Sequence, residues 1–245
     1  ILFIDIETAP NVAHVWGLFD QNIGINQILD SGYTLCWAAK FLGEEAVYFD
    51  SIHLSGEKRM LESIHALLDE ADVAVHWNGN KFDIPTLNKE FVLNGMAPPA
   101  PAKNLDLMLV SRNRFRFASN KLDYVAQQLG IGKKIEHEGH TLWIRCMNGE
   151  QAAWEAMEEY NINDVILLEG IYQRFLPWIK NHPNLNIDNE TGQACPNCGS
   201  NHLERRGFTS TVAGKFQRYQ CKGCGTWSRG KINLANKKII VQDKT

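Results

Sequence analysis

The first part of the chain alternates between short apolar runs and segments with helical spacing. Residues 1–7, 33–41, 46–51 and 73–77 are short apolar runs. Runs of this length and composition are typical of strands. Between the last two, residues 57–71 repeat apolar side chains at helical spacing. This predicts an opening three-stranded sheet that leads through a helix to a fourth strand, which is a crossover unit.

The rest of the chain predicts helices and then a change of organisation. We expect helices over residues 84–94, 120–129 and 149–175, and a short apolar stretch over 104–110. Together these elements form a predicted domain over residues 1–180. Residues 181–194 are rich in turn formers and predict a linker. Residues 195–245 are too few to build an apolar core of their own, so a second, small domain there needs another source of stability.

Composition and charge exclude some classes of protein and separate the two domains. The 245 residues are 44% apolar and 22% charged, which suits a globular protein with at least one full core. No apolar run approaches the roughly 20 residues that cross a bilayer, so we expect no membrane partner. Residues 1–180 hold 15 Lys/Arg against 24 Asp/Glu, a net charge of -9, and residues 181–245 hold 10 against 4, a net charge of +6. The two parts should therefore meet different partners.

Four of the six cysteines occur as two Cys-x-x-Cys pairs, Cys195/Cys198 and Cys221/Cys224, with 22 residues between the pairs. This spacing is typical of a structural Zn²⁺ site with four thiolate ligands, and two disulfides are the alternative. A metal pattern favours a reducing compartment, and no secretory pattern precedes the first strand. We expect a cytoplasmic protein with one structural Zn²⁺.

The cysteine segment also carries a surplus of positive charge mixed with aromatic residues. Both features are typical of surfaces that bind nucleic acid. A protein partner that docks on the segment is the alternative. The basic residues that we expect to contact nucleic acid here are Arg205, Arg206, Lys215 and Arg218.

Acidic residues in the first domain suggest a metal site. Asp5 and Glu7 lie two apart in the first predicted strand, so their side chains share one face and repel each other unless cations hold them. Tyr160 and Asp164 are four apart and share one face of the long predicted helix. Asp83 stands where it would cap a helix. Each has a structural alternative: the end of an edge strand, a surface pair and a plain helix cap.

In this order and with these neighbours, the three segments resemble the motifs of the proofreading-type 3'–5' exonucleases of the DEDD superfamily. The matching segments are Phe3-Ile-Asp5-Ile-Glu7-Thr8, Asn78-Gly-Asn-Lys-Phe-Asp83 and Tyr160-Asn-Ile-Asn-Asp164. The tyrosine favours the tyrosine subgroup of this superfamily, since the histidine form would have His at the position of Glu159. Residues 122–130, the stretch around Trp143 and residues 176–179 are similar to the family-B-polymerase-like branch. The resemblance covers residues 1–178, and the cysteine segment resembles a zinc ribbon.

The resemblance implies a ribonuclease-H-like α/β fold with a mixed sheet flanked by helices, and a two-metal mechanism. Asp5 would bridge two Mg²⁺ or Mn²⁺ ions, Glu7 and Asp164 would complete the site of the water-activating ion, and Asp83 would hold the second ion. Tyr160 would orient the attacking water, and 5'-mononucleotides would leave from a 3' end. Oxygen ligands without a His or Cys cluster nearby suit these ions.

The same domain offers candidate contacts to the substrate. Asn78 and Phe82 suit hydrogen bonding and base stacking, with turn formation and core packing as alternatives. Arg112, Arg114 and Arg116 form a basic and aromatic run with Phe115 and Phe117, which suits phosphates and bases or a solvated loop. Single-stranded DNA is the favoured substrate. The alternatives are RNA, a flap or junction, and a nucleic-acid-binding adaptor that has lost its nuclease activity.

Overall fold

The computed structural model describes residues 1–184, 186, 193–212 and 214–235. The chain forms two compact units, Ile1–Gln173 and Arg174–Thr245. Residues 185 and 187–192 of the predicted linker and residues 236–245 of the predicted ribbon lie outside the described residues. Among the helices that the described residues form, none has the length and apolar composition of a membrane span.

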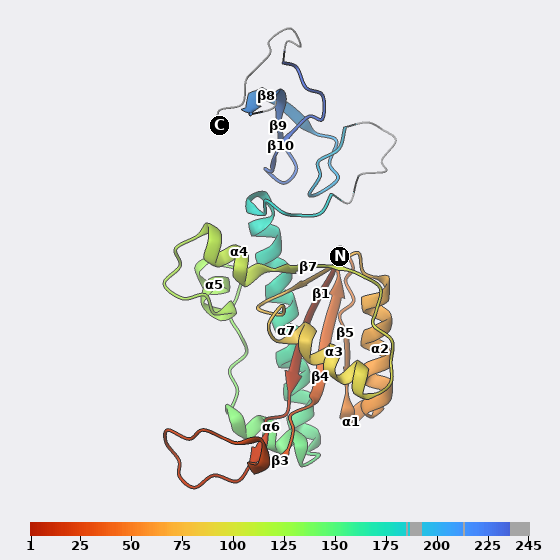
Figure 1. Ribbon diagram of the computed structural model, residues 1–245, viewed down its shortest axis with the longest axis vertical. Coiled ribbons are helices and arrows are strands. Elements are labelled where there is room, and N and C mark those ends of the chain that lie inside the picture. The colour runs from red at the N-terminus through yellow and green to blue at the C-terminus, as the bar shows by residue number, and fades with distance from the viewer. Residues whose placement is uncertain (185, 187–192, 213, 236–245) are drawn as a thin grey trace. The chain divides into compact units, whose positions relative to one another are not determined.

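A five-stranded mixed sheet forms the centre of the first unit (Figure 1). β1 pairs antiparallel with β4 and parallel with β6, which places it in the middle. The strand order is β5-β4-β1-β6-β7. The strands are β1 (Leu2–Thr8), β4 (Thr34–Phe41), β5 (Tyr48–Ser51), β6 (Val73–His76) and β7 (Lys103–Asp106). A separate two-stranded sheet pairs β2 (Val12–Ala13) with β3 (Ile28–Asp30), which follows the 3₁₀ helix η1 (Ile25–Gln27).

The predicted helices over residues 57–71, 84–94, 120–129 and 149–175 correspond to α2 (Glu57–Glu70), α3 (Asp83–Leu93), α5 (Leu122–Gln128) and α7 (Gln151–Phe175). The apolar stretch over 104–110 is divided between β7 and α4 (Leu107–Arg114). Asp106 causes the change, because its side chain accepts hydrogen bonds from the amides of Met108 and Leu109 and so caps α4. The sequence did not predict α1 (Ile52–Ser55) or α6 (His140–Met147).

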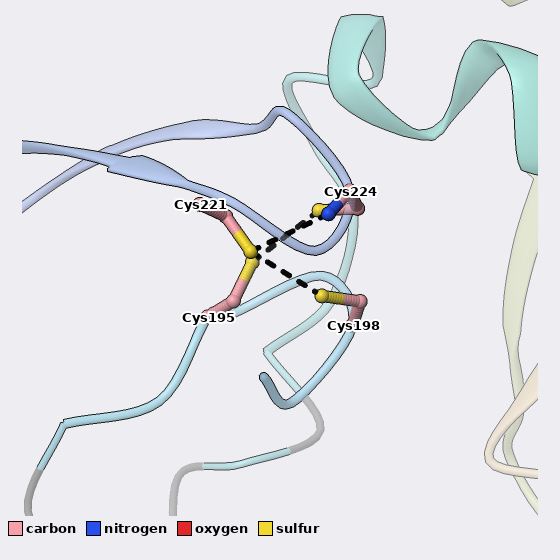
Figure 2. A group of neighbouring side chains, drawn as sticks. All are labelled: Cys195, Cys198, Cys221 and Cys224. Atoms are coloured by element: carbon pink, nitrogen blue, oxygen red, sulfur yellow. Dashed lines mark hydrogen bonds between the residues drawn. The ribbon is translucent and has the colours of Figure 1, made fainter. Parts of the chain in front are cut away.

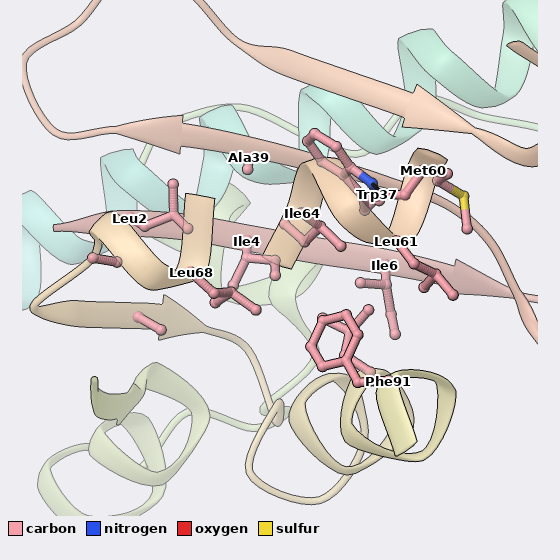
Figure 3. Packing of buried hydrophobic residues seen from close by; sticks show 13 residues of the cluster. Leu2, Ile4, Ile6, Trp37, Ala39, Met60, Leu61, Ile64, Leu68 and Phe91 are labelled. Atoms are coloured by element: carbon pink, nitrogen blue, oxygen red, sulfur yellow. Dashed lines mark hydrogen bonds between the residues drawn. The ribbon is translucent and has the colours of Figure 1, made fainter. Parts of the chain in front are cut away.

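The alternation of side chains along β1 connects the core to the acidic residues. Leu2, Ile4 and Ile6 are buried against α2 and α3, as Figure 3 shows. Burial of each such side chain contributes about 1.5–3 kcal/mol. The intervening residues face α7: the ring of Phe3 packs on Tyr172, with ring centroids 5.3 Å apart. Because the strand has a period of two, Asp5 and Glu7 also project toward α7.

The second unit contains a three-stranded antiparallel sheet in the order β10-β9-β8. Its strands are β8 (Leu203–Thr211), β9 (Gly214–Cys221) and β10 (Trp227–Arg229), and the 3₁₀ helix η2 (Leu176–Trp178) comes before them in the chain. Most side chains of the sheet are exposed or half-buried. A second source of stability is therefore needed, as the sequence predicted.

Candidate active site and zinc centre

Three carboxylates meet between β1 and α7. Asp5 and Glu7 come from the strand and Asp164 from the helix, and one oxygen from each lies within 4.8 Å of the others. A residue of α7 also fixes the first acid, because the side-chain amide of Asn161 donates a hydrogen bond of 2.7 Å to Oδ2 of Asp5. The strand and the helix therefore bring together residues that are more than 150 positions apart.

Burial and mutual repulsion disfavour the ionised form of these three carboxylic acids. Burial raises the pKa of Asp5 well above its usual range, and the carboxylates of Asp83, Glu7 and Asp164 raise it further. Burial raises the pKa of Glu7 to about 8, although Lys134 opposes the change. Burial also raises the pKa of Asp164, again against Lys134. Clustered acids with raised pKa values are typical of sites that bind cations or transfer protons.

Asp83 reaches the same strand from the other side of the sheet. It is the first residue of α3, whose N-cap is Phe82, so the structure corrects the expectation that Asp83 caps this helix. Its Oδ1 instead accepts a hydrogen bond of 3.2 Å from the amide of Ile6, between the two acids of β1. Burial raises its pKa to about 7, against the hydrogen bond from Ile6, which lowers it. Asp83 does not belong to the three-carboxylate cluster.

Tyr160 lies one turn before Asp164 on α7 and is buried. Its ring packs edge-on against His137 and Trp143, with ring centroids 4.7 Å and 6.1 Å away. Its hydroxyl accepts a hydrogen bond of 2.8 Å from Nζ of Lys134. Burial raises the pKa of Tyr160 above its usual range, and the carboxylates of Asp164 and Glu7 add to the rise. The phenol therefore stays protonated at neutral pH.

Lys134 is a site residue that the sequence analysis missed. Its ammonium forms an ion pair with Asp164, in addition to the hydrogen bond to Tyr160. Burial lowers the pKa of Lys134, but Asp164 and Tyr160 outweigh burial and raise the pKa above its usual range. The amide of Lys134 donates a hydrogen bond of 2.8 Å to Oδ1 of Asp123 on α5, which holds this part of the loop. In the sequence, only the Lys133-Lys134 pair after the predicted helix at 120–129 could have indicated it.

The donor set fits divalent cations that prefer oxygen. Oδ1 of Asp164 is buried and has no hydrogen-bond partner among the described residues. A buried carboxylate oxygen without a partner is costly unless it ligates an ion. Asp5 and Glu7 supply further oxygens beside it, and the described groups of metal-type ligands at this site include no His or Cys. This combination suits Mg²⁺ or Mn²⁺.

A cavity of about 680 Å³ adjoins the acids. Asp5, Asp164 and Lys134 line it together with two predicted substrate contacts, Asn78 and Arg112. The other predicted substrate contacts of the first unit, Phe82, Arg114 and Arg116, do not line this cavity. The Phe82 residue is 44% exposed to solvent. Further lining residues that the sequence analysis did not name are Trp77, Met108, Ala118, Ser119, Asn120, Lys121, Leu122 and Asp123.

The turn after β6 places Asn78 at the mouth of this site. Asn78 has a left-handed backbone with φ of 68°, and its amide donates a hydrogen bond of 3.0 Å to Oδ1 of Asp106. The next residue is Gly79, whose amide donates to Nδ1 of the buried His76 over 3.1 Å. A Cβ at Gly79 would lie 2.4 Å from Cγ of His76, so only glycine fits this turn.

The four cysteines of the second unit form a compact cluster, with their sulfur atoms turned toward one another (Figure 2). The Sγ atoms of Cys195 and Cys224, and those of Cys198 and Cys221, are 3.6 Å apart. A disulfide needs about 2.0 Å, and all four cysteines are free. Four sulfurs around one zinc ion, each about 2.3 Å from it, lie about 3.8 Å from one another. The cluster is therefore compatible with a zinc ribbon.

Hydrogen bonds to Sγ of Cys221 also favour a thiolate at that position. The amide of Cys224 approaches Sγ of Cys221 at 3.5 Å. Burial raises the pKa of Cys221, but hydrogen bonds from the amides of Cys224 and Gly223 and from the neighbouring thiols outweigh it and lower the pKa to about 7. A thiol near its ionisation point at neutral pH is readily converted to a metal ligand.

The predicted basic contacts of the ribbon are divided within its sheet. Arg205 lies opposite Tyr219, whereas Arg218 lies opposite Arg229 on the next strand. Arg206 follows Arg205 at a bulge of β8, and Lys215 lies above the ring of Phe208, with Nζ 4.5 Å from the ring centroid. The structure therefore does not gather these four residues into one patch.

Comparisons with known proteins agree with this architecture. Among solved structures, the chain is similar to the family B DNA polymerase from the hyperthermophilic archaeon Pyrobaculum calidifontis, with a TM-score of 0.56 and 18% sequence identity. The match covers 72% of this chain and 24% of the polymerase chain. No curated protein matches the chain. The family profile of the RNase_H superfamily matches residues 2–176, which confirms the predicted ribonuclease-H-like fold. The chain therefore belongs to the RNase_H superfamily.

Proposed function

We propose that this protein is a metal-dependent 3'–5' exonuclease that hydrolyses the phosphodiester bonds of single-stranded DNA. The observation that carries the proposal is the convergence of Asp5, Glu7 and Asp164, two of which, Asp5 and Asp164, line a cavity of about 680 Å³. Membership in the RNase_H superfamily and the likeness to a DNA polymerase support a nuclease. The polarity and the 5'-mononucleotide products rest on the motif resemblance.

The three clustered carboxylates would hold the ions, with Asp83 as a further ligand. Two Mg²⁺ or Mn²⁺ ions bound there would neutralise the phosphate, activate water and stabilise the leaving oxygen. The raised pKa values of the acids suit this role, because a bound cation would offset the burial and the mutual repulsion that raise them. One structural Zn²⁺ on Cys195, Cys198, Cys221 and Cys224 would hold the ribbon together.

The neighbouring side chains would position the reacting groups. Tyr160 keeps its proton, and Lys134 fixes the hydroxyl from one side, so the phenol can orient a water molecule beside the scissile phosphate. The ammonium of Lys134 also offsets negative charge that develops next to Asp164. Asn78 and Arg112 line the cavity where they could contact the terminal nucleotide and its phosphate.

The test compares the wild type with Asp5→Ala on single-stranded DNA and RNA that carry a label at the 3' or the 5' end. Reactions contain Mg²⁺, Mn²⁺ or a chelator and are resolved on a sequencing gel. We expect 3'-labelled DNA to release a labelled mononucleotide immediately and 5'-labelled DNA to give a descending ladder. Both results should depend on Asp5 and on metal. Faster cleavage of RNA would identify a ribonuclease, and binding without any cleavage would identify an adaptor.

A further inference from the structure

The sheet of the second unit has two faces, and each carries cations and aromatic rings. Side chains alternate along β9, so Phe216, Arg218 and Gln220 share one face and Lys215, Gln217 and Tyr219 share the other. The strand register assigns the neighbours, because residues directly opposite in an antiparallel pair lie on the same face. We call the first the Trp227 face; it carries Phe216, Arg218 and Gln220 of β9, Trp227 and Arg229 of β10, and Glu204 and Thr209 of β8. The second is the Tyr219 face, which carries Lys215, Gln217 and Tyr219 of β9, Ser228 of β10, and Arg205 and Phe208 of β8.

Cations and aromatic rings alternate on the Trp227 face. The guanidinium carbon of Arg218 lies 4.8 Å from the ring centroid of Trp227, and that of Arg229 lies 4.4 Å from the ring centroid of Phe216. Arg218 is also fixed by a hydrogen bond of 2.9 Å from its Nε to the carbonyl oxygen of Arg206. The two arginines are opposite each other on neighbouring strands. The face therefore presents two ordered guanidinium groups, each stacked on an aromatic ring.

Part of this face stays open to solvent and carries unneutralised charge. Trp227 is 49% exposed, and both arginines are exposed. No carboxylate of the described residues pairs with Arg218 or Arg229. Between residues 195 and 235 the sequence holds seven Lys/Arg and one acid, Glu204. Glu204 lies on this face opposite Gln220, but Arg206 and Lys222 pair with it at 2.9 Å and 2.7 Å.

The Tyr219 face differs in its surroundings. Arg205, Gln217, Tyr219 and Ser228 line a hollow that residues 193–194 and 229–232 also border. The segment after β10 is attached to β9, because the amide of Gly230 donates a hydrogen bond of 2.8 Å to the carbonyl oxygen of Gln217. The face also carries the exposed ring of Phe208 with Lys215 above it, but the chain itself flanks the face. The two faces thus provide a matched comparison within one small sheet.

A ligand of the Trp227 face must offer flat rings and negative charge at short intervals. Single-stranded nucleic acid offers both, since an exposed base can stack on an indole or a guanidinium plane while phosphates pair with the arginines. A duplex hides the faces of its bases, so it could use only the charges. An acidic peptide would likewise use the arginines and leave the exposed indole without a stacking partner.

We propose that the Trp227 face binds single-stranded nucleic acid by stacking bases against Trp227 and the two arginines. The inference deepens the proposed function and rests on it in one respect, namely that the protein acts on nucleic acid. It separates the basic residues that the sequence grouped together, because Arg218 belongs to this face and Arg205 and Lys215 belong to the other.

The experiment measures binding of a fluorescein-labelled oligothymidylate by fluorescence anisotropy, using the full-length chain with zinc bound and no added Mg²⁺. Trp227→Ala should weaken binding about tenfold, which corresponds to the loss of one stacked base. Arg218→Ala and Arg229→Ala should each weaken binding and reduce the slope of log affinity against log salt by about one. The matched controls on the other face, Arg205→Ala and Lys215→Ala, should change affinity less than the Trp227 variant.

Two further measurements distinguish a loss of binding from a loss of the zinc site or of catalysis. Each variant must retain its bound zinc, and Trp227→Phe, which keeps a flat ring, should restore most of the affinity. Hydrolysis of the p-nitrophenyl ester of thymidine 5'-monophosphate reports on the catalytic unit alone and should be unchanged in Trp227→Ala. Unaltered oligonucleotide affinity in Trp227→Ala would overturn the inference even if nuclease activity is found. Loss of affinity in a protein that cleaves nothing would support the inference and reject only the exonuclease.

Discussion

The ammonium of Lys134 donates a hydrogen bond to the hydroxyl of Tyr160 over 2.8 Å. Lys134 also pairs with Asp164, one helical turn from Tyr160. A single cation therefore connects the phenol that is proposed to orient water with a carboxylate that is proposed to bind metal. This geometry makes the contribution of Lys134 testable separately from that of the acids.

Lys134→Met should lower kcat about 10²-fold, because it removes a positive group beside the charge that develops in the reaction. KM should change little, since the proposed role is greatest in the transition state. Steady-state kinetics on a labelled oligonucleotide measures both. Lys133→Met is the matched control, because the Lys133 side chain is 69% exposed and pairs only with Glu136 at the surface. Equal losses in the two variants would argue against a specific role for Lys134.

Tyr160→Phe should slow turnover about tenfold or more while substrate binding persists. The substitution keeps the ring that packs on His137 and Trp143 and removes only the hydroxyl that Lys134 holds. Single-turnover cleavage and oligonucleotide binding separate the two effects. Tyr48→Phe provides a surface control. Wild-type turnover in Tyr160→Phe would remove this residue from the mechanism.

The metal-free protein should lose stability as pH rises from about 4.5 to about 8. In the unfolded chain Glu7 ionises near the usual pKa of a glutamate, 4.5, whereas in the folded chain its pKa is about 8. Within this window the folded state holds a proton that the unfolded state has released, so stability falls as pH rises. Asp83, with a folded pKa of about 7, adds to the same trend. Thermal unfolding across this pH range measures the slope.

Divalent cations should remove much of that pH dependence, because they stabilise the ionised acids of the folded state. Asp5→Asn should raise the melting temperature of the metal-free protein at pH 8 and reduce the additional stabilisation by Mg²⁺. The substitution removes one of the repelling charges and keeps an oxygen that can accept the hydrogen bond from Asn161. A melting temperature that rises with pH in the absence of metal would contradict the proposed electrostatics.

Elemental analysis of the purified protein should find one zinc per chain. Cys221→Ser should lose it and unfold the second unit, since four thiolates complete a structural zinc site. Cys146→Ser is the control: burial raises the pKa of Cys146 to about 11, and it lies outside the cysteine cluster. Full zinc occupancy in Cys221→Ser would show that this residue is not a ligand.

Gly79→Ala should destabilise the protein by about 1–3 kcal/mol, because the added Cβ would lie 2.4 Å from the buried ring of His76. It should also lower activity, since the turn sets the position of Asn78 in the cavity. Gly17→Ala is the control, as its Cβ would meet only the end of the flexible Gln21 side chain. Chemical denaturation measures the difference in the free energy of unfolding.

The sequence by itself determined the fold class, the strands and helices that carry the three acidic motifs, and the two cysteine pairs. These features are local: period-two and helical patterns determine which side chains share a face, and the short Cys-x-x-Cys spacing indicates paired metal-type ligands. The resemblance of three motifs in order then sufficed for the ribonuclease-H-like fold, which the family match over residues 2–176 confirms.

Only the tertiary structure decided which distant residues meet. Lys134 lies in a loop with no periodic pattern, and its contact with Tyr160 depends on how Asp123 of α5 holds that loop. Asp83 could not be separated from a helix cap until β1 was placed beside α3, where Ile6 donates to it. In the ribbon, charge alone grouped Arg205 with Arg218, but strand register assigns them to opposite faces. Long-range pairing sets these relationships, and composition and local spacing carry no information about it.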